Sequence, residues 1–167
     1  MNDFVMRAKH WQVFLLTMVA LLLINFTVDD SALLSGLIGA VGYCLYFTWF
    51  AVMGNALFLL LPRETEYNLT WFLIDVFLVA AVWASLVLIQ EDRKYHATGL
   101  EALLGFYLFF AMLHAPWFLA AALVAIEKKR KPEFGFYFGT LILFVFWPIG
   151  LWFIQPRLNK VWKQQQS

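Results

Sequence analysis

The chain has 167 residues, of which 63% are hydrophobic and only 14% are charged, and its formal net charge is +1. This composition excludes an ordinary soluble domain, and the near-neutral charge argues against nucleic acid as a partner. The charges gather in short joints between long apolar stretches. This pattern predicts an all-α, polytopic membrane helix bundle with short loops. Residues 1–167 are expected to form one integral membrane domain, with the lipid bilayer as its partner.

About five apolar stretches are predicted to cross the membrane, since some 20 helical residues span a hydrocarbon core roughly 30 Å thick. In chain order they cover residues 11–28, 32–61, 69–90, 101–126 and 134–154. The second is too long for one crossing and too short for two, so we expect one tilted helix whose end bends along the interface near Gly54 and Asn55. Residues 156–167 are predicted to form an amphipathic interfacial helix.

The basic residues predict how the chain threads through the membrane. Arg7 and Lys9 precede the first stretch, Asp29 and Asp30 follow it, and the basic run 128–131 separates the fourth stretch from the fifth. Because Lys and Arg resist translocation, this pattern places the N-terminus in the cytoplasm.

The C-terminal tail departs from that pattern. With five crossings, Arg157, Lys160 and Lys163 would face outward, against the preference of basic residues for the inner side. Pro148 and Gly150 are expected to kink the last stretch. An alternative is therefore a fifth segment that breaks at these two residues and returns to the side it came from.

The basic run has two interpretations. A cluster next to a membrane helix can bind anionic lipid headgroups or an acidic partner, but orientation of the chain alone requires such a cluster, and we favour this simpler explanation. The run consists of Lys128, Lys129, Arg130 and Lys131.

Small residues recur near the start of the second stretch. Ser35 with Gly39, and Gly36 with Ala40, lie four residues apart on one helix face. This spacing lets another helix backbone approach closely, which predicts a helix-packing face. The partner helix can belong to the same chain or to a second protomer.

Two ionisable residues lie inside apolar stretches, where a charge is costly unless it finds a partner or water. Asp75 is six residues into the third stretch, and His114 is in the middle of the fourth. Pro116 follows His114 closely and cannot donate a backbone hydrogen bond to the carbonyl of Met112. Because histidine titrates near neutrality and a free carbonyl attracts water, Asp75, His114 and Pro116 form a candidate polar site for moving protons.

Both residues also have structural interpretations. His114 is as compatible with a neutral side chain bonded to a neighbouring helix, and Asp75 with a local partner near the end of its stretch. Their predicted depths differ by roughly 9 Å, so a direct pair would need a tilted helix or a bridging water.

The sequence offers no cofactor or metal site. The predicted depths of His10, His96 and His114 all differ, whereas haem or metal ligation needs ligands that converge. No phosphate-binding loop, HExxH motif or catalytic triad order is present, and we expect the protein not to be an enzyme.

Two short segments resemble a family of small, uncharacterised bacterial membrane proteins. The residues from Trp147 to Lys160 read WPIGLWFIQPRLNK, and those from Lys9 to Gln12 read KHWQ. The resemblance implies a multi-span protein of the bacterial cytoplasmic (inner) membrane and implies no activity.

Three functions remain open at this point. The first is an accessory, regulatory or assembly subunit that acts through intramembrane helix contacts with a membrane protein partner or a second copy. The second is a small oligomeric proton or ion channel or transporter that uses His114 and Asp75. The third is a membrane enzyme or electron carrier acting on a hydrophobic substrate, for which no convergent site is visible in the sequence.

Overall fold

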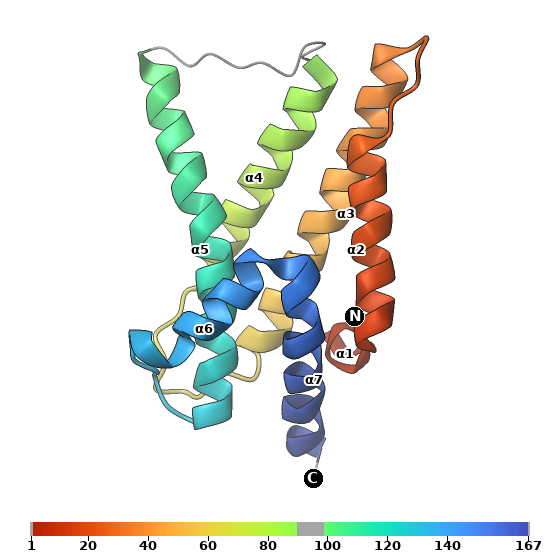
Figure 1. Ribbon diagram of the computed structural model, residues 1–167. Coiled ribbons are helices and arrows are strands. Elements are labelled where there is room, and N and C mark those ends of the chain that lie inside the picture. The colour runs from red at the N-terminus through yellow and green to blue at the C-terminus, as the bar shows by residue number, and fades with distance from the viewer. Residues whose placement is uncertain (1, 90–98, 167) are drawn as a thin grey trace.

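A computed structural model describes residues 2–89 and 99–166 of the chain, and over these ranges it is all-helical, as predicted (Figure 1). Seven helices are described: α1 (Asn2–Arg7), α2 (His10–Asn25), α3 (Ala32–Phe58), α4 (Leu69–Ile89), α5 (Leu100–Lys128), α6 (Phe134–Val145) and α7 (Trp147–Gln166).

Three of these helices, α3, α4 and α5, are long and apolar enough to cross a membrane. Helices α2 and α6 are apolar but shorter. Helices α2 to α5 pack in chain order, each against the next, and run along the length of the bundle (Figure 1). The first, third and fourth predicted stretches therefore correspond to α2, α4 and α5, each with ends within three residues of the prediction.

The second stretch forms one helix, as expected. Helix α3 remains helical through Gly54 and Asn55 and ends at Phe58, so the helix is not interrupted where the bend is predicted. Gly54 instead provides room for the ring of Phe72 on α4, which a Cβ at this position would overlap. The glycine serves close helix packing rather than a change of direction.

The fifth stretch is not one continuous helix, as a single straight crossing would require. Helix α6 ends at Val145, and Phe146 has φ −94° and ψ 50°, outside the helical region. The chain then reverses: Arg157 Nη1 donates a hydrogen bond of 2.9 Å to Thr140 Oγ1. In a straight helix these residues would lie about 25 Å apart. Figure 1 shows α7 returning beside α6 towards the end of the bundle from which α6 starts.

The break lies just before the residues predicted to kink the chain. Pro148 is the second residue of α7. The N–H groups of the first helical turn have no partner within the helix, so the missing N–H of proline costs no hydrogen bond there. At Gly150, a Cβ would overlap the carbonyl oxygen of Leu143 on α6, so only glycine lets the two helices meet this closely. Residues 156–166 are helical, as predicted, but they continue α7 through Pro156 and do not begin a separate tail helix.

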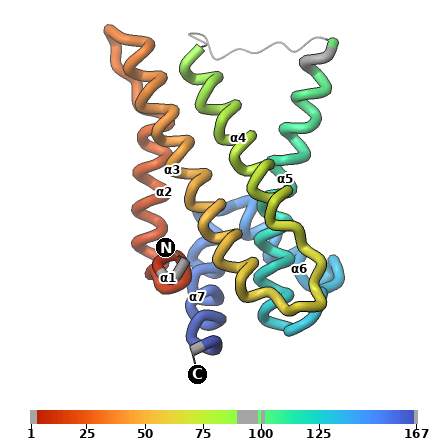
Figure 2. Tube along the Cα trace, turned by 180° about the vertical axis from the view of Figure 1, so that it is seen from behind, coloured from red at the N-terminus to blue at the C-terminus, as the bar shows by residue number. Residues whose placement is uncertain are grey.

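Hydrogen bonds join the two ends of the chain. Gln155 Nε2 donates to the carbonyl oxygens of Val5 and Ala8, at 2.9 and 3.0 Å, and Asn159 Nδ2 donates to that of Met6 at 2.8 Å. These bonds hold α1 against α7. Both termini lie at the same end of the bundle (Figure 2).

The core is concentrated in the half of the bundle that contains the termini. Residues 118–126 of α5 are all buried there, and four of them are alanines, which allow neighbouring helices to approach. In the other half, α4 and α5 diverge (Figures 1 and 2). Side chains of α5 are exposed there, up to 74% for Phe106.

Candidate functional site

The structure brings Asp75 and His114 into direct contact. His114 Nδ1 lies 2.5 Å from Asp75 Oδ2, and the hydroxyl of Tyr107 donates to Asp75 Oδ1 at 2.6 Å. Asp75 is only 2% exposed. Both oxygens of this buried carboxylate therefore have a partner, which offsets the cost of removing the carboxylate from water.

The predicted difference in depth between the two residues was an error of register. Phe72, three residues after the start of α4, stacks on Phe118 of α5 with ring centroids 4.4 Å apart. Phe118 lies ten residues before the end of α5 at Lys128, so α5 projects beyond the start of α4 by about seven residues, or about 10 Å. This offset cancels the difference expected from the sequence.

Aromatic rings enclose the imidazole of His114. Phe110 stacks on one side with centroids 5.7 Å apart, and Trp117 stacks on the other at 5.4 Å. Trp117 Nε1 donates a 3.0 Å hydrogen bond to the hydroxyl of Tyr137 on α6. The orientation of the imidazole is therefore fixed by Asp75, by two rings of its own helix and, through Trp117, by α6.

The pair borders a pocket of about 350 Å³ between α4 and α5. The remaining walls include Glu66 and Asn68 from the segment before α4, together with Trp71 and Tyr107. Since His114 Nδ1 faces Asp75, Nε2 is the ring nitrogen left to exchange a proton with a group or water in the pocket. The pocket is lined in part by the segment that joins α3 to α4. Figure 2 shows this segment on the half of the bundle that contains the termini.

The chemistry available here is that of proton exchange. A carboxylate, an imidazole and a phenol are linked by hydrogen bonds, so one proton can be held between Asp75 and His114 without leaving an isolated charge. Over residues 2–89 and 99–166, no three His, Cys, Asp or Glu side chains converge as metal ligands. The ring of His10 packs at a tilt against Trp152 of α7, with ring centroids 4.7 Å apart, and His96 lies outside the described residues.

Pro116 lies near this site without breaking α5, which is helical on both sides of it. It lines a second, mostly apolar cavity of about 250 Å³, whose walls also include Phe50, Val79 and Phe144. Pro116 leaves the carbonyl of Met112, two residues before His114, without its usual helical donor.

The small-residue face packs within the chain. A Cβ on Gly36 would come within 2.6 Å of the carbonyl oxygen of Val87 on α4. Gly39 faces both the Val87 side chain and the backbone of Ile24 on α2. Ser35 Oγ donates to the carbonyl of Ser31, and its oxygen also accepts from the backbone N–H of Val28. Ala40, the fourth member of the predicted face, is partly buried.

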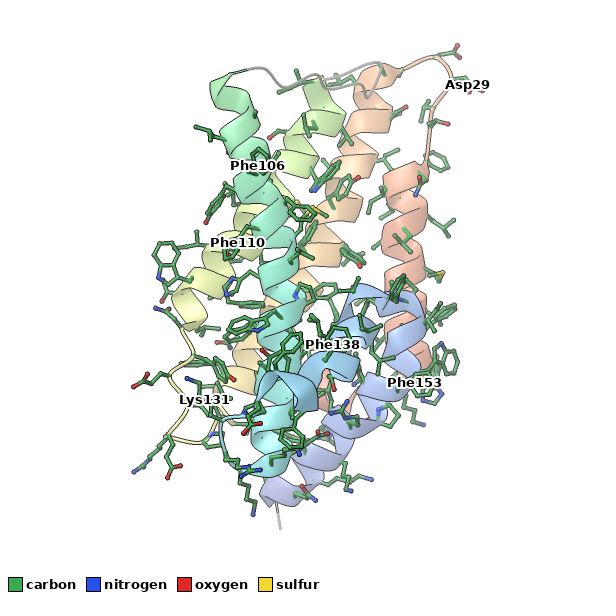
Figure 3. All side chains as sticks on the ribbon, turned by 60° about the vertical axis from the view of Figure 1, so that its left-hand side comes forward. Asp29, Phe106, Phe110, Lys131, Phe138 and Phe153 are labelled. Atoms are coloured by element: carbon green, nitrogen blue, oxygen red, sulfur yellow. The ribbon has the colours of Figure 1, made fainter. Side chains whose placement is uncertain are left out.

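The basic run follows α5 at the end of the bundle opposite Asp29, as the labels of Asp29 and Lys131 show in Figure 3. Lys128 Nζ lies 3.4 Å from the centroid of the Phe136 ring, a cation–π contact with α6. Lys129, Arg130 and Lys131 are exposed. Lys129 adopts φ 53°, a left-handed conformation that ends α5.

Sequence reasoning missed Tyr107 and Trp117 as parts of the site. Helical spacing offered a signal, since Tyr107 and Phe110 lie seven and four residues before His114 and Trp117 three after it, all on one face of α5. Figure 3 shows Phe106 and Phe110 along this helix. The sequence does not show which side chain accepts the hydrogen bond of Tyr107, because the acceptor, Asp75, belongs to another helix, α4.

Searches against protein-family models, curated proteins and solved structures found no match to this chain. The resemblance of its C-terminal segment to small bacterial membrane proteins therefore stays a prediction.

Proposed function

We propose that the protein crosses a bacterial cytoplasmic membrane four times, through α2 to α5, and that α6 and α7 form a hairpin that enters the membrane and returns. Ten of the twelve Lys and Arg residues flank these helices at the end that contains the termini; the other two, Arg93 and Lys94, lie outside the described residues. The positive-inside rule then makes this end cytoplasmic. With four crossings, the basic C-terminal tail lies on the cytoplasmic side, whereas five crossings would place it outside.

Within this topology, the function best supported is that of a small proton-coupled channel or transporter. The observation that carries the proposal is the direct Asp75–His114 contact, with both carboxylate oxygens hydrogen-bonded and a pocket at its edge. Ionisable residues at such depth are rare and usually mark an ion or proton path. The pocket beside Glu66 gives the pair a route to the cytoplasmic side.

Proton flux into liposomes containing the purified protein tests this proposal. We expect wild-type flux to vary between about pH 5.5 and 8 and to be abolished in His114→Ala. Asn25→Ala is the control, because within the described part of the chain the Asn25 side chain bonds only the carbonyl of Leu21 on its own helix, at 2.8 Å. Absence of flux from folded, inserted wild-type protein would contradict the proposal, as would undiminished flux in His114→Ala.

A second function is favoured by the exposed half of α5. Leu103, Phe106 and Phe109 are 64%, 74% and 64% exposed, and their spacing of three residues places them on one broad face of the helix. Such a segment suits an accessory subunit that contacts another membrane protein or a second copy of this chain. For this function, we expect a stoichiometric partner to copurify with the wild-type protein in mild detergent. The partner should be lost from the Phe106→Ala variant. No observation favours the membrane-enzyme alternative.

A further inference from the structure

A basic pocket lies between the α1–α2 junction and α7, apart from the Asp75–His114 site. Its volume is about 530 Å³. Its walls carry three ammonium groups, an imidazole and two amides but no carboxylate, and are formed by Lys9, His10, Pro156, Asn159, Lys160, Lys163 and Gln164.

Hydrogen bonds between the two segments hold this basic pocket together. Asn159 Nδ2 donates to the carbonyls of Met6 and Ala8 at 2.8 and 3.2 Å, and Gln155 reinforces the same contact from the preceding turn. Lys9 is thereby kept opposite Lys160 and Lys163, although about 150 residues separate them in sequence. Among the described side chains, none of these three lysines forms an ion pair with a carboxylate. Their mutual repulsion is therefore not offset within this part of the chain, which favours an anionic ligand.

The surroundings of the basic pocket select an amphipathic anion. On α7, Trp152, Pro156 and Lys160 follow one another at intervals of four residues, so one face of the helix passes from aromatic to basic. Trp152 packs against His10 and Phe14, with ring centroids 4.7 and 5.8 Å apart, and is 47% exposed. An acyl chain can lie along Trp152 while a phosphate occupies the pocket, an arrangement that a free phosphate ion would not use.

We propose that the basic pocket binds the phosphate-bearing headgroup of an anionic phospholipid from the cytoplasmic leaflet. Lys9, Lys160 and Lys163 neutralise the phosphate, and Trp152 contacts the glycerol and upper acyl region. By binding Lys9 and α7 at once, the lipid stabilises the contact between the two ends of the chain. This site is distinct from the basic run at 128–131, whose Lys128 is engaged with Phe136.

Thermal unfolding of the full chain in detergent tests the proposal, with phosphatidylglycerol, phosphatidylcholine or inorganic phosphate added. At a lipid concentration about tenfold above half-saturation, we expect phosphatidylglycerol to raise the Tm by about 3 °C, and phosphatidylcholine to raise it by less than about 1 °C. The pocket variant Lys9→Gln/Lys160→Gln/Lys163→Gln should lose the shift. The matched control Lys129→Gln/Arg130→Gln/Lys131→Gln removes the same charge outside the pocket and should keep it.

Native mass spectrometry provides a second readout that does not depend on reversible unfolding. The wild type and the control variant should each retain one more phosphatidylglycerol per chain than the pocket variant. If the pocket variant does not fold, the single variant Lys163→Gln takes its place in this comparison. Equal loss in pocket and control variants would show nonspecific attraction and overturn the proposal. An equal shift with inorganic phosphate would assign the pocket to free phosphate and overturn the lipid assignment.

Discussion

At the scale of single residues, Asp75 sets the strongest constraint on the bundle. A carboxylate that is 2% exposed among apolar helices is stable only if its oxygens are paired, and the two partners both come from α5, as Tyr107 and His114. Asp75 therefore fixes the register of α4 against α5 as well as providing a proton-binding group.

Removal of these partners should have unequal effects on stability. We expect His114→Ala to lower the free energy of unfolding by about 3 kcal/mol, because it leaves a buried carboxylate with one partner. Tyr107→Phe, which removes one hydroxyl, should cost about 1 kcal/mol. Both are measured by denaturant unfolding in detergent.

The control is a double-mutant cycle with Asp75→Asn. If Asp75 and His114 interact as described, the double variant should lose at least about 1 kcal/mol less than the sum of the single variants. Additive effects would contradict a direct contact.

The sequence identified Asp75 and His114, since ionisable residues in apolar stretches are conspicuous. It did not predict their contact. Besides the bonds of Asp75, the alignment of the two helices depends on the stacking of Phe72 on Phe118, an interaction between residues 46 positions apart that leaves no periodic signal in either helix.

At the scale of elements, the α6–α7 hairpin is the part of the fold that single-helix reasoning misjudged. Hydropathy treats residues 134–154 as one apolar stretch, and it does not distinguish a straight helix from two that fold back on each other. Pro148 and Gly150 marked the region, but the direction of the chain after the break depends on contacts of α7 with α1 and α5. Those contacts include the bidentate pair of Arg157 with Glu127, at 2.7 and 2.6 Å.

The hairpin should be sensitive to a single methyl group. We expect Gly150→Ala to lower the free energy of unfolding by about 2 kcal/mol, because the new Cβ overlaps the backbone carbonyl of Leu143, which cannot rotate away. Gly139→Ala on α6 is the matched control, since a Cβ there meets nothing within 4 Å. The control should be neutral or slightly stabilising. Equal effects of the two changes on the Tm would contradict the close packing at Gly150.

At the scale of the whole molecule, the hairpin reconciles the charge distribution with the fold. Four crossings predict that Arg157, Lys160 and Lys163 share a side with the basic run at 128–131, whereas five crossings put them on opposite sides. The all-helical class and the ends of most long helices followed from hydropathy, because these depend on local composition. The side on which the chain ends depends on a tertiary turn and was left open.

Both proposals depend on this topology, because it places the pocket beside Glu66 and the basic pocket on the same side of the membrane. The most direct test is the sidedness of single cysteines in a Cys44→Ser background, labelled with a membrane-impermeant maleimide in intact and permeabilised cells. Asn2→Cys and Gln165→Cys should both be protected in intact cells, and Asp29→Cys should be labelled. Labelling of Gln165→Cys together with Asp29→Cys would contradict the returning hairpin and restore the fifth crossing.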